Sequence, residues 1–229
     1  MKMTLMQHFK ELRNRVLWSL LFFVLAFVAG FYFSPMVQDF IMAPLMSVWE
    51  SGEMIYTGIE DALMIQFSLA GLFAMLASMP FVLYHLWKYV APALRQNEKK
   101  IIVPLIIVSP LLFISGAAFA YFILLPMMFE FFISIGSDSV KMLPNVKNYL
   151  SFSIDILKAF GLAFQFPLVL IILNRAKLLS RKSVLSLSRY IIVGIFILAA
   201  ILTPPDIISQ IALALPLVVL FALSLLFMI

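Results

Sequence analysis

Long, mostly apolar runs alternate with short charged segments along the whole chain. The runs are 14 to 27 residues long. About 20 residues of α-helix, rising about 1.5 Å each, cross a hydrocarbon core of about 30 Å. The pattern therefore predicts an all-α, polytopic membrane protein with six transmembrane helices. The predicted spans are residues 16–34, 62–87, 101–127, 149–174, 190–203 and 207–229.

The fifth run is the shortest and would reach only about 21 Å as a helix, because it has 14 residues before Pro204-Pro205-Asp206. A short span thins the bilayer or associates with other helices. Prolines inside the runs predict kinks. They are Pro80, Pro104, Pro110, Pro167 and Pro216. We therefore predict a concave bundle with short spans five and six, and a locally thinned bilayer beside them.

Basic segments alternate with non-basic segments between the two sides of the predicted membrane. Residues 2–15, 88–100 and 175–189 carry net charges of +3, +3 and +5. Residues 35–61 carry −5, and residues 128–148 are neutral overall. Because cytoplasmic loops are enriched in Lys and Arg, this alternation predicts that both termini are cytoplasmic.

Composition agrees with a membrane protein and narrows the function. The chain is 64% hydrophobic and 12% charged, with mean hydropathy +1.11. Soluble domains average about 45–50% apolar and about 25% charged residues. We expect one six-span domain, residues 1–229. It has no cysteine and two histidines, His8 and His85, and it contains no phosphate-binding or nucleophile motif. We therefore expect no enzyme, no metal site, no cofactor and no nucleic-acid partner.

Polar residues at membrane depth are costly and are functional candidates by default. Gln165 lies near the middle of the fourth run, next to Pro167. It is either an interhelical hydrogen-bonding residue or a functional one. Asp155 and Lys158, spaced i, i+3, are either a self-neutralising pair or part of a solute path. The second alternative would make the protein a secondary transporter for a small charged solute.

Two acids stand alone in strongly basic segments. Glu11 lies among Lys10, Arg13 and Arg15, and it can form an i, i+4 pair with Arg15. Glu98 lies beside Lys99 and can pair with its neighbouring bases. From residue types alone, both acids are either structural salt-bridge partners or binding residues on one surface.

Seven motifs follow one another along the chain. They are His8-Phe-Lys-Glu-Leu-Arg13, Ala43-Pro-Leu45 in the first outer loop, Ala91-Pro-Ala-Leu94 followed by Glu98-Lys-Lys, Ala118-Phe-Ala-Tyr121-Phe, Tyr149-Leu-Ser-Phe152, Ala159-Phe-Gly161 with Phe164-Gln-Phe-Pro167, and Leu202-Thr-Pro-Pro-Asp206. With these motifs in this order, the chain closely resembles the TatC family, the multi-spanning receptor of the twin-arginine protein translocase. The motifs extend through almost the whole chain.

The resemblance implies a receptor, in a bacterial-type cytoplasmic (inner) membrane, that binds twin-arginine signal peptides of folded precursors. It implies assembly with the single-span proteins TatA and TatB, several copies of the receptor in one complex, and export driven by the proton-motive force. The implied signal-peptide-binding residues are Glu11, Arg13, Tyr89, Arg95 and Glu98. The implied TatA/TatB contacts are Thr203 and Gln210, and the functionally sensitive loop residues are Pro44 and Asp206.

Gln165 and the two isolated acids, Glu11 and Glu98, bear on this implied function. Many members of the family have Glu where this chain has Gln165, so a titrating carboxylate at that position is not essential here. Carboxylates accept bidentate hydrogen bonds from guanidinium groups, so two acids on one surface could serve two arginines. We also predict that Gln165 lies on the wall of a partly wet cavity that opens toward the basic side.

Overall fold

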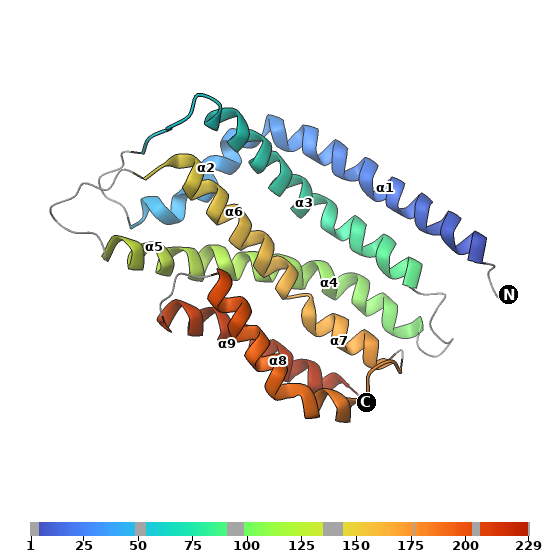
Figure 1. The fold of residues 1–229 in the computed structure, drawn as a ribbon. Helices are drawn as coiled ribbons and strands as arrows, with labels where there is room; N and C mark the ends of the chain where they lie inside the picture. The colour runs from blue at the N-terminus through green and yellow to red at the C-terminus, as the bar shows by residue number, and fades with distance from the viewer. Residues whose placement is uncertain are drawn as a thin grey trace.

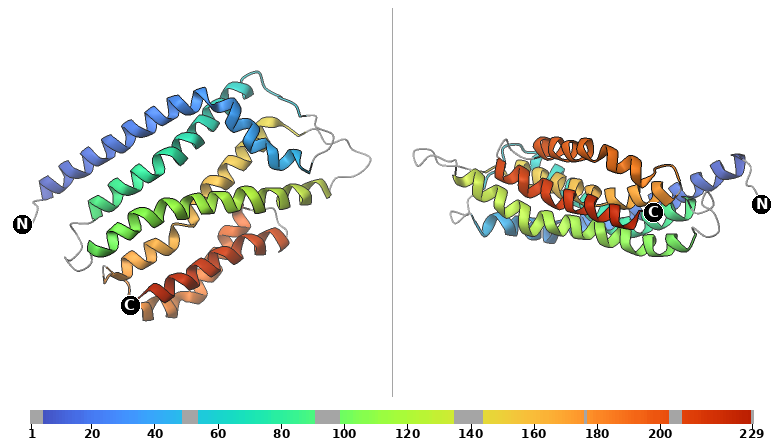
Figure 2. Two further views of the ribbon diagram at one scale, coloured as in Figure 1. Left: turned by 180° about the vertical axis from the view of Figure 1, so that it is seen from behind. Right: turned by 90° about the horizontal axis from the view of Figure 1, so that it is seen from below.

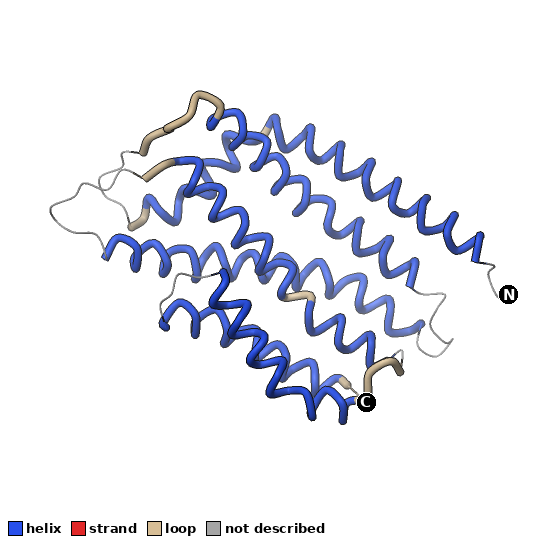
Figure 3. Tube along the Cα trace, in the orientation of Figure 1, coloured by secondary structure: helices blue, strands red, loops and turns tan. Residues whose placement is uncertain are grey.

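The computed structural model describes residues 5–48, 54–90, 99–134, 144–175, 177–202 and 207–228, and nearly all of them lie in helices (Figures 1 and 3). The helices are α1 (Leu5–Tyr32), α2 (Ser34–Met46), α3 (Asp61–Val90), α4 (Lys99–Phe119), the π-helix η2 (Ala120–Leu124), α5 (Leu125–Ser134), α6 (Val146–Ala163), α7 (Phe166–Arg175), α8 (Arg181–Leu202) and α9 (Ile207–Phe227).

The prediction of six membrane-spanning helices is confirmed. The candidate spans are α1, α3, α4 continuing through η2 into α5, α6 with α7, α8 and α9. We call the end of the bundle where α1 and α8 begin the basic end, and the end that holds α2 and the start of α6 the acidic end. Figure 1 shows the basic end at the right and the acidic end at the left.

The structure corrects two predicted boundaries. Pro44 does not lie in a loop but inside α2, a 13-residue helix within the segment predicted to connect the first two spans. The third span does not end near Pro126 but continues to Ser134. Pro126 is tolerated because the preceding π-helix has already replaced the regular i, i+4 bonding there.

The fifth span is longer than its uncharged run, since α8 begins at Arg181 and has 22 residues. It nevertheless remains shorter than α3, which has 30 residues. At a rise of about 1.5 Å per residue, α8 reaches about 33 Å and α3 about 45 Å. Figure 1 shows accordingly that the hairpin of α8 and α9 ends before the level that α3, α5 and α6 reach. The fifth span is therefore longer than the predicted length of about 21 Å, and spans five and six are short only relative to α3.

The helices form a flattened layer rather than a round bundle (Figure 2). α1 lies along α3 through stacked rings such as Phe22 on Phe81, whose centroids are 4.0 Å apart. α4 and α6 cross closely because Gly116 and Gly161 face the opposite helix. A Cβ added at Gly116 would lie 2.6 Å from the carbonyl oxygen of Phe160. The main apolar core draws buried residues from α2, α3 and every later helix.

Two tyrosines fix α2 to the rest of the bundle. Pro44 has no N–H, so the carbonyl of Phe40, one turn earlier in α2, loses its usual helical donor. The Tyr121 hydroxyl donates to that carbonyl at 2.6 Å, and its ring stacks on Phe40. The Tyr149 hydroxyl donates to the carbonyl of Ile41 at 2.7 Å. Three motifs that are far apart in the sequence therefore meet at one point.

Candidate functional sites

Glu11 lies on the first turns of α1, one helical turn before Arg15. The Arg15 guanidinium donates to Glu11 Oε1 from Nε, at 3.1 Å, and from Nη2. The predicted i, i+4 pair is therefore confirmed. The Glu11 side chain is only 23% exposed and the Arg15 side chain only 15% exposed. The other carboxylate oxygen, Oε2, is buried and has no hydrogen-bond partner among the described residues. Glu11 thus holds one guanidinium and has an acceptor left over.

The neighbouring site residues lie at the same end. Arg13 is exposed on α1, and Tyr89 is half-buried in the last turn of α3. Counting from the stacked Phe22 and Phe81, Glu11 lies about 17 Å along α1 and Tyr89 about 12 Å along α3, both toward the basic end. Glu11 and Tyr89 therefore occupy similar levels. Arg95 and Glu98 lie outside the described residues, in the connection between α3 and α4.

Gln165 lies where the fourth span breaks between α6 and α7. Its amide oxygen accepts from the Ser109 hydroxyl at 2.5 Å, and its amide nitrogen donates to the Ser109 carbonyl at 2.9 Å. Ser109 is fully buried in α4. The amide is therefore satisfied across the interface between α4 and the fourth span. The sequence offered no signal for Ser109, because the two residues are 56 positions apart.

A groove of about 750 Å³ lies between the fourth span and the α8–α9 hairpin, and Gln165 contributes to its wall. Gln165 therefore lies on a groove wall, whereas the predicted water inside the groove and its predicted opening toward the basic side stay predictions. Every other lining side chain is apolar, and the lining includes Leu162, Leu198 and Leu217. At Gly194, on the α8 wall, an added Cβ would meet no atom within 4 Å. The groove is therefore open and apolar.

Of the two residues predicted to contact single-span partners, the structure describes Gln210. Gln210, in the first turn of α9, donates from its amide nitrogen to the Phe196 carbonyl at 3.2 Å. Phe196 is two residues away from Gly194, so Gln210 approaches α8 on a face other than that of the groove. Thr203 and Asp206 lie outside the described residues.

Asp155 and Lys158 form the predicted i, i+3 pair, with Nζ and Oδ1 3.5 Å apart. Neither is enclosed by the bundle. The Asp155 side chain is 76% exposed and the Lys158 side chain 36% exposed. Both lie on α6, within a candidate membrane span. The pair therefore carries charge on the outside of the helix bundle, within a membrane span.

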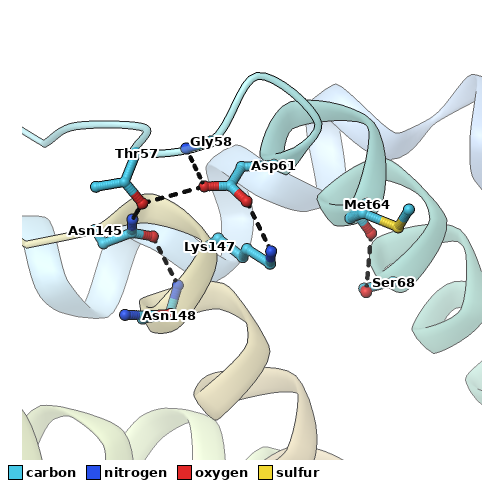
Figure 4. A network of polar contacts seen from close by, with 8 residues as sticks. All are labelled: Thr57, Gly58, Asp61, Met64, Ser68, Asn145, Lys147 and Asn148. Atoms are coloured by element: carbon cyan, nitrogen blue, oxygen red, sulfur yellow. Dashed lines mark hydrogen bonds and ion pairs between the residues drawn. The ribbon is translucent and has the colours of Figure 1, made fainter.

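A polar network at the acidic end was not predicted (Figure 4). Asp61, the first residue of α3, is 3% exposed and accepts from Lys147 Nζ at 2.7 Å and from the Gly58 N–H at 2.7 Å. Asn145 donates to the Thr57 hydroxyl at 2.5 Å and caps α6 through the Asn148 N–H. The network joins the segment before α3 to the start of α6. Only the acidic residue at the start of an apolar run could have indicated it.

Comparison with known proteins decides the family. The sequence model described as "Sec-independent protein translocase protein (TatC)" matches residues 7–216. The chain belongs to the TatC family. It is 40% identical to TatC of Haemophilus influenzae over 97% of this chain and 87% of the relative, and 33% identical to TatC of Escherichia coli K12 with the same coverage.

Solved structures agree with the sequence comparison. A crystal structure of the twin arginine translocase receptor TatC in the detergent DDM superposes with a TM-score of 0.85 at 32% identity, and covers 96% of this chain and 98% of that one. A second crystal structure of the same receptor gives a TM-score of 0.82 at 33% identity. The chain is therefore a multi-pass membrane protein and a component of the twin-arginine translocase.

Proposed function

We propose that this TatC protein binds the arginine pair of a twin-arginine signal peptide at its basic end, with Glu11 as a principal acceptor. The observation that supports this proposal most directly is the state of the Glu11 carboxylate. One of its oxygens already accepts two N–H groups of a guanidinium, and the other is buried without a partner among the described residues. A buried, unpaired acceptor costs about 1–3 kcal/mol, and a guanidinium donor would recover that energy.

The proposed site has four further residues. Arg13 and Tyr89 lie at similar levels on α1 and α3, and we propose that Arg95 and Glu98, in the following connection, complete the site. The second carboxylate would serve the second arginine. The apolar part of a signal peptide would bind along the Phe- and Met-rich surfaces of the spans, so the affinity would not depend on the ion pairs alone.

A peptide titration tests the proposal. We expect Glu11→Ala and Glu98→Ala each to weaken the binding of a fluorescent signal peptide by about 1–3 kcal/mol, the range for hydrogen bonds to charged groups. Replacing the arginines of the peptide with lysines should also weaken binding, because an ammonium lacks the planar fork of donors. Asp39→Ala is a matched control, since Asp39 is an exposed acid at the other end of the molecule. Unchanged affinity in both Glu variants would leave these acids as structural residues.

We further propose the setting in which this receptor works. The basic end would face the cytoplasm of a bacterial-type inner membrane, because basic loops remain on that side. The α8–α9 edge, with Thr203 and Gln210, would dock TatA and TatB, and Pro44 and Asp206 would shape the opposite side. Several copies would assemble into a complex powered by the proton-motive force. The protein would act as one six-span domain and as a receptor rather than an enzyme.

The secondary-transporter alternative has less support from the geometry. Gln165 is bonded inward to Ser109, and Asp155 and Lys158 lie on an exposed surface. Within the described part of the chain, these three residues therefore do not line one enclosed path. Solute uptake by the reconstituted protein alone would support the transporter; precursor binding without uptake would refute it.

A further inference from the structure

The Asp155–Lys158 pair lies at a depth where exposed charge needs a polar partner. Asp155 is nine residues from the start of the 30-residue span Val146–Arg175, or about 14 Å along a helix of about 45 Å. A hydrocarbon core of about 30 Å centred on that helix would begin about 7–8 Å from its end. A carboxylate that is 76% exposed would then face acyl chains, which is costly unless a polar group covers it.

The α8–α9 hairpin ends at the same level as this pair. Measured from the basic end, α8 extends for 22 residues, about 33 Å, and the fourth span from Arg175 back to Asp155 extends for 20 residues, about 30 Å. In a bilayer thinned beside the short hairpin, as predicted from the sequence, lipid headgroups would lie close to Asp155. A headgroup in this leaflet can reach the pair without crossing the core.

The apolar groove begins directly beside the charged pair. On α6 the groove is lined by Ala159, next to Lys158, and then by Leu162 and Ala163. Ala159 lies one turn after Asp155, so both lie on the same face of the helix. Along α6, toward the basic end, the order is therefore an acceptor for a cation, a donor for an anion, and an apolar groove of about 750 Å³.

We propose that this surface is a binding site for a zwitterionic phospholipid with a primary ammonium headgroup, taken from the leaflet at the acidic end. In such a lipid the phosphate lies between the ammonium and the acyl chains. The order of groups on the lipid matches the order on α6: the ammonium meets Asp155, the phosphate meets Lys158, and an acyl chain enters the groove. The two side chains are 3.5 Å apart, longer than a charge-assisted hydrogen bond of about 2.7–2.9 Å, so both retain bonding capacity.

The groove suits an acyl chain better than a partner helix. A helix 10–12 Å in diameter, laid along the eleven residues of α8 from Ile191 to Ile201, a length of about 15 Å, would occupy about 1,200–1,700 Å³. The groove offers about 750 Å³. The apolar wall suits an acyl chain, and it offers a transmembrane helix only one polar side chain, Gln165, which is already bonded to Ser109.

The test measures thermal unfolding of the delipidated receptor in detergent with added phosphatidylethanolamine, phosphatidylcholine or phosphatidylglycerol. A ligand that binds only the folded state raises the melting temperature. We expect phosphatidylethanolamine to give the largest rise, because the quaternary ammonium of phosphatidylcholine has no N–H donor and phosphatidylglycerol has no cation. Equal rises with the three lipids would overturn the proposal.

Two variants locate the effect. Exchanging the pair, Asp155→Lys with Lys158→Asp, keeps the net charge and the ion pair but reverses the order of charges, so the preference for phosphatidylethanolamine should disappear. Gly194→Phe should fill the groove, because a Cβ added at Gly194 meets no atom within 4 Å, and it should reduce the rise in melting temperature. This variant tests the site independently if the exchanged-pair variant does not fold. Asp39→Asn is the control for an exposed charge elsewhere. A full phosphatidylethanolamine effect in either the exchanged-pair variant or the Gly194→Phe variant would refute the site.

A crosslinking probe identifies the occupant in membranes. The chain has no cysteine, so Leu162→Cys places a single photoreactive label in the groove. Adducts with phospholipid support the proposal. Adducts mainly with protein would show that a polypeptide occupies the groove, and rapid modification of the same cysteine by a charged, water-soluble maleimide would show that water fills it. Either result would overturn the lipid assignment.

Discussion

The bond between Tyr121 and the Phe40 carbonyl gives the sharpest test of how the outer helix α2 is held. Tyr121→Phe removes the hydroxyl while keeping the ring that stacks on Phe40. The carbonyl then has neither this donor nor a helical one, because residue 44 is proline. Hydrogen bonds between membrane helices average about 0.6 kcal/mol and reach about 1.7, and an orphaned acceptor adds to the loss. We expect a loss of about 1–2 kcal/mol in the free energy of unfolding.

The same reasoning predicts a specific rescue. Pro44→Ala restores an N–H that can donate to the Phe40 carbonyl through the regular i, i+4 bond. In the Pro44→Ala background, Tyr121→Phe should therefore cost less, and the coupling between the two substitutions should be about 1 kcal/mol. Tyr149→Phe is the matched control. Its acceptor, the Ile41 carbonyl, lies one turn before Leu45, whose N–H remains available, so this substitution should not couple to Pro44→Ala.

The assay is a double-mutant cycle, with reversible unfolding followed in detergent by circular dichroism. Six proteins are sufficient: the wild type, the three single variants and the two doubles that carry Pro44→Ala. Additive costs for Tyr121→Phe and Pro44→Ala would refute the claim that the tyrosine replaces the donor missing at proline. Equal coupling for the Tyr149 control would attribute the effect to a general change in α2 instead.

Three further substitutions test other contacts. Gln165→Leu should lower the free energy of unfolding by about 1 kcal/mol, from the two bonds to Ser109, while keeping precursor export; loss of export at normal stability would show that Gln165 also acts in transport. Gly116→Ala should cost about 1–3 kcal/mol, because its Cβ would lie 2.6 Å from a backbone oxygen, whereas Gly194→Ala should cost nothing; similar melting temperatures for both would contradict the close crossing. Asp61→Asn should lower the melting temperature, and a value equal to that of the wild type would mean that the network does not hold the acidic end.

Hydropathy predicted the six spans because an apolar segment inside a membrane must satisfy its own backbone hydrogen bonds and therefore forms a helix. Boundaries set by tertiary structure could not be predicted in the same way. The beginning of α2 carries a signal, Pro35 in its first turn, and apolar Val37, Ile41 and Leu45 recur at helical spacing. The five acids of the surrounding segment concealed that signal. The start of α8 also carried one, since the Ser180 hydroxyl accepts from the Ser183 N–H at 3.0 Å as a helix cap.

The candidate site was predictable where partners are close in sequence. The Glu11–Arg15 and Asp155–Lys158 pairs follow from helical spacing alone, and both are present. Ser109 could not be paired with Gln165 from sequence, because their contact depends on how α4 crosses the fourth span. The Asp61 network depends in the same way on the segment before α3 lying beside α6. Long-range polar contacts therefore needed the three-dimensional structure.

Polarity alone does not distinguish structural from binding residues within the span Val146–Arg175; burial and partners do. Gln165 and Asp155 lie ten residues apart on one span, and each is costly in hydrocarbon. Gln165 is half-buried and makes two hydrogen bonds with the buried Ser109, and these bonds offset the cost of placing its amide in hydrocarbon. Asp155 is exposed, and its ion pair is long, so the bundle itself does not cover the charge. The described residues supply no closer partner than Lys158, and the ammonium of a lipid headgroup beside the short hairpin would cover the charge.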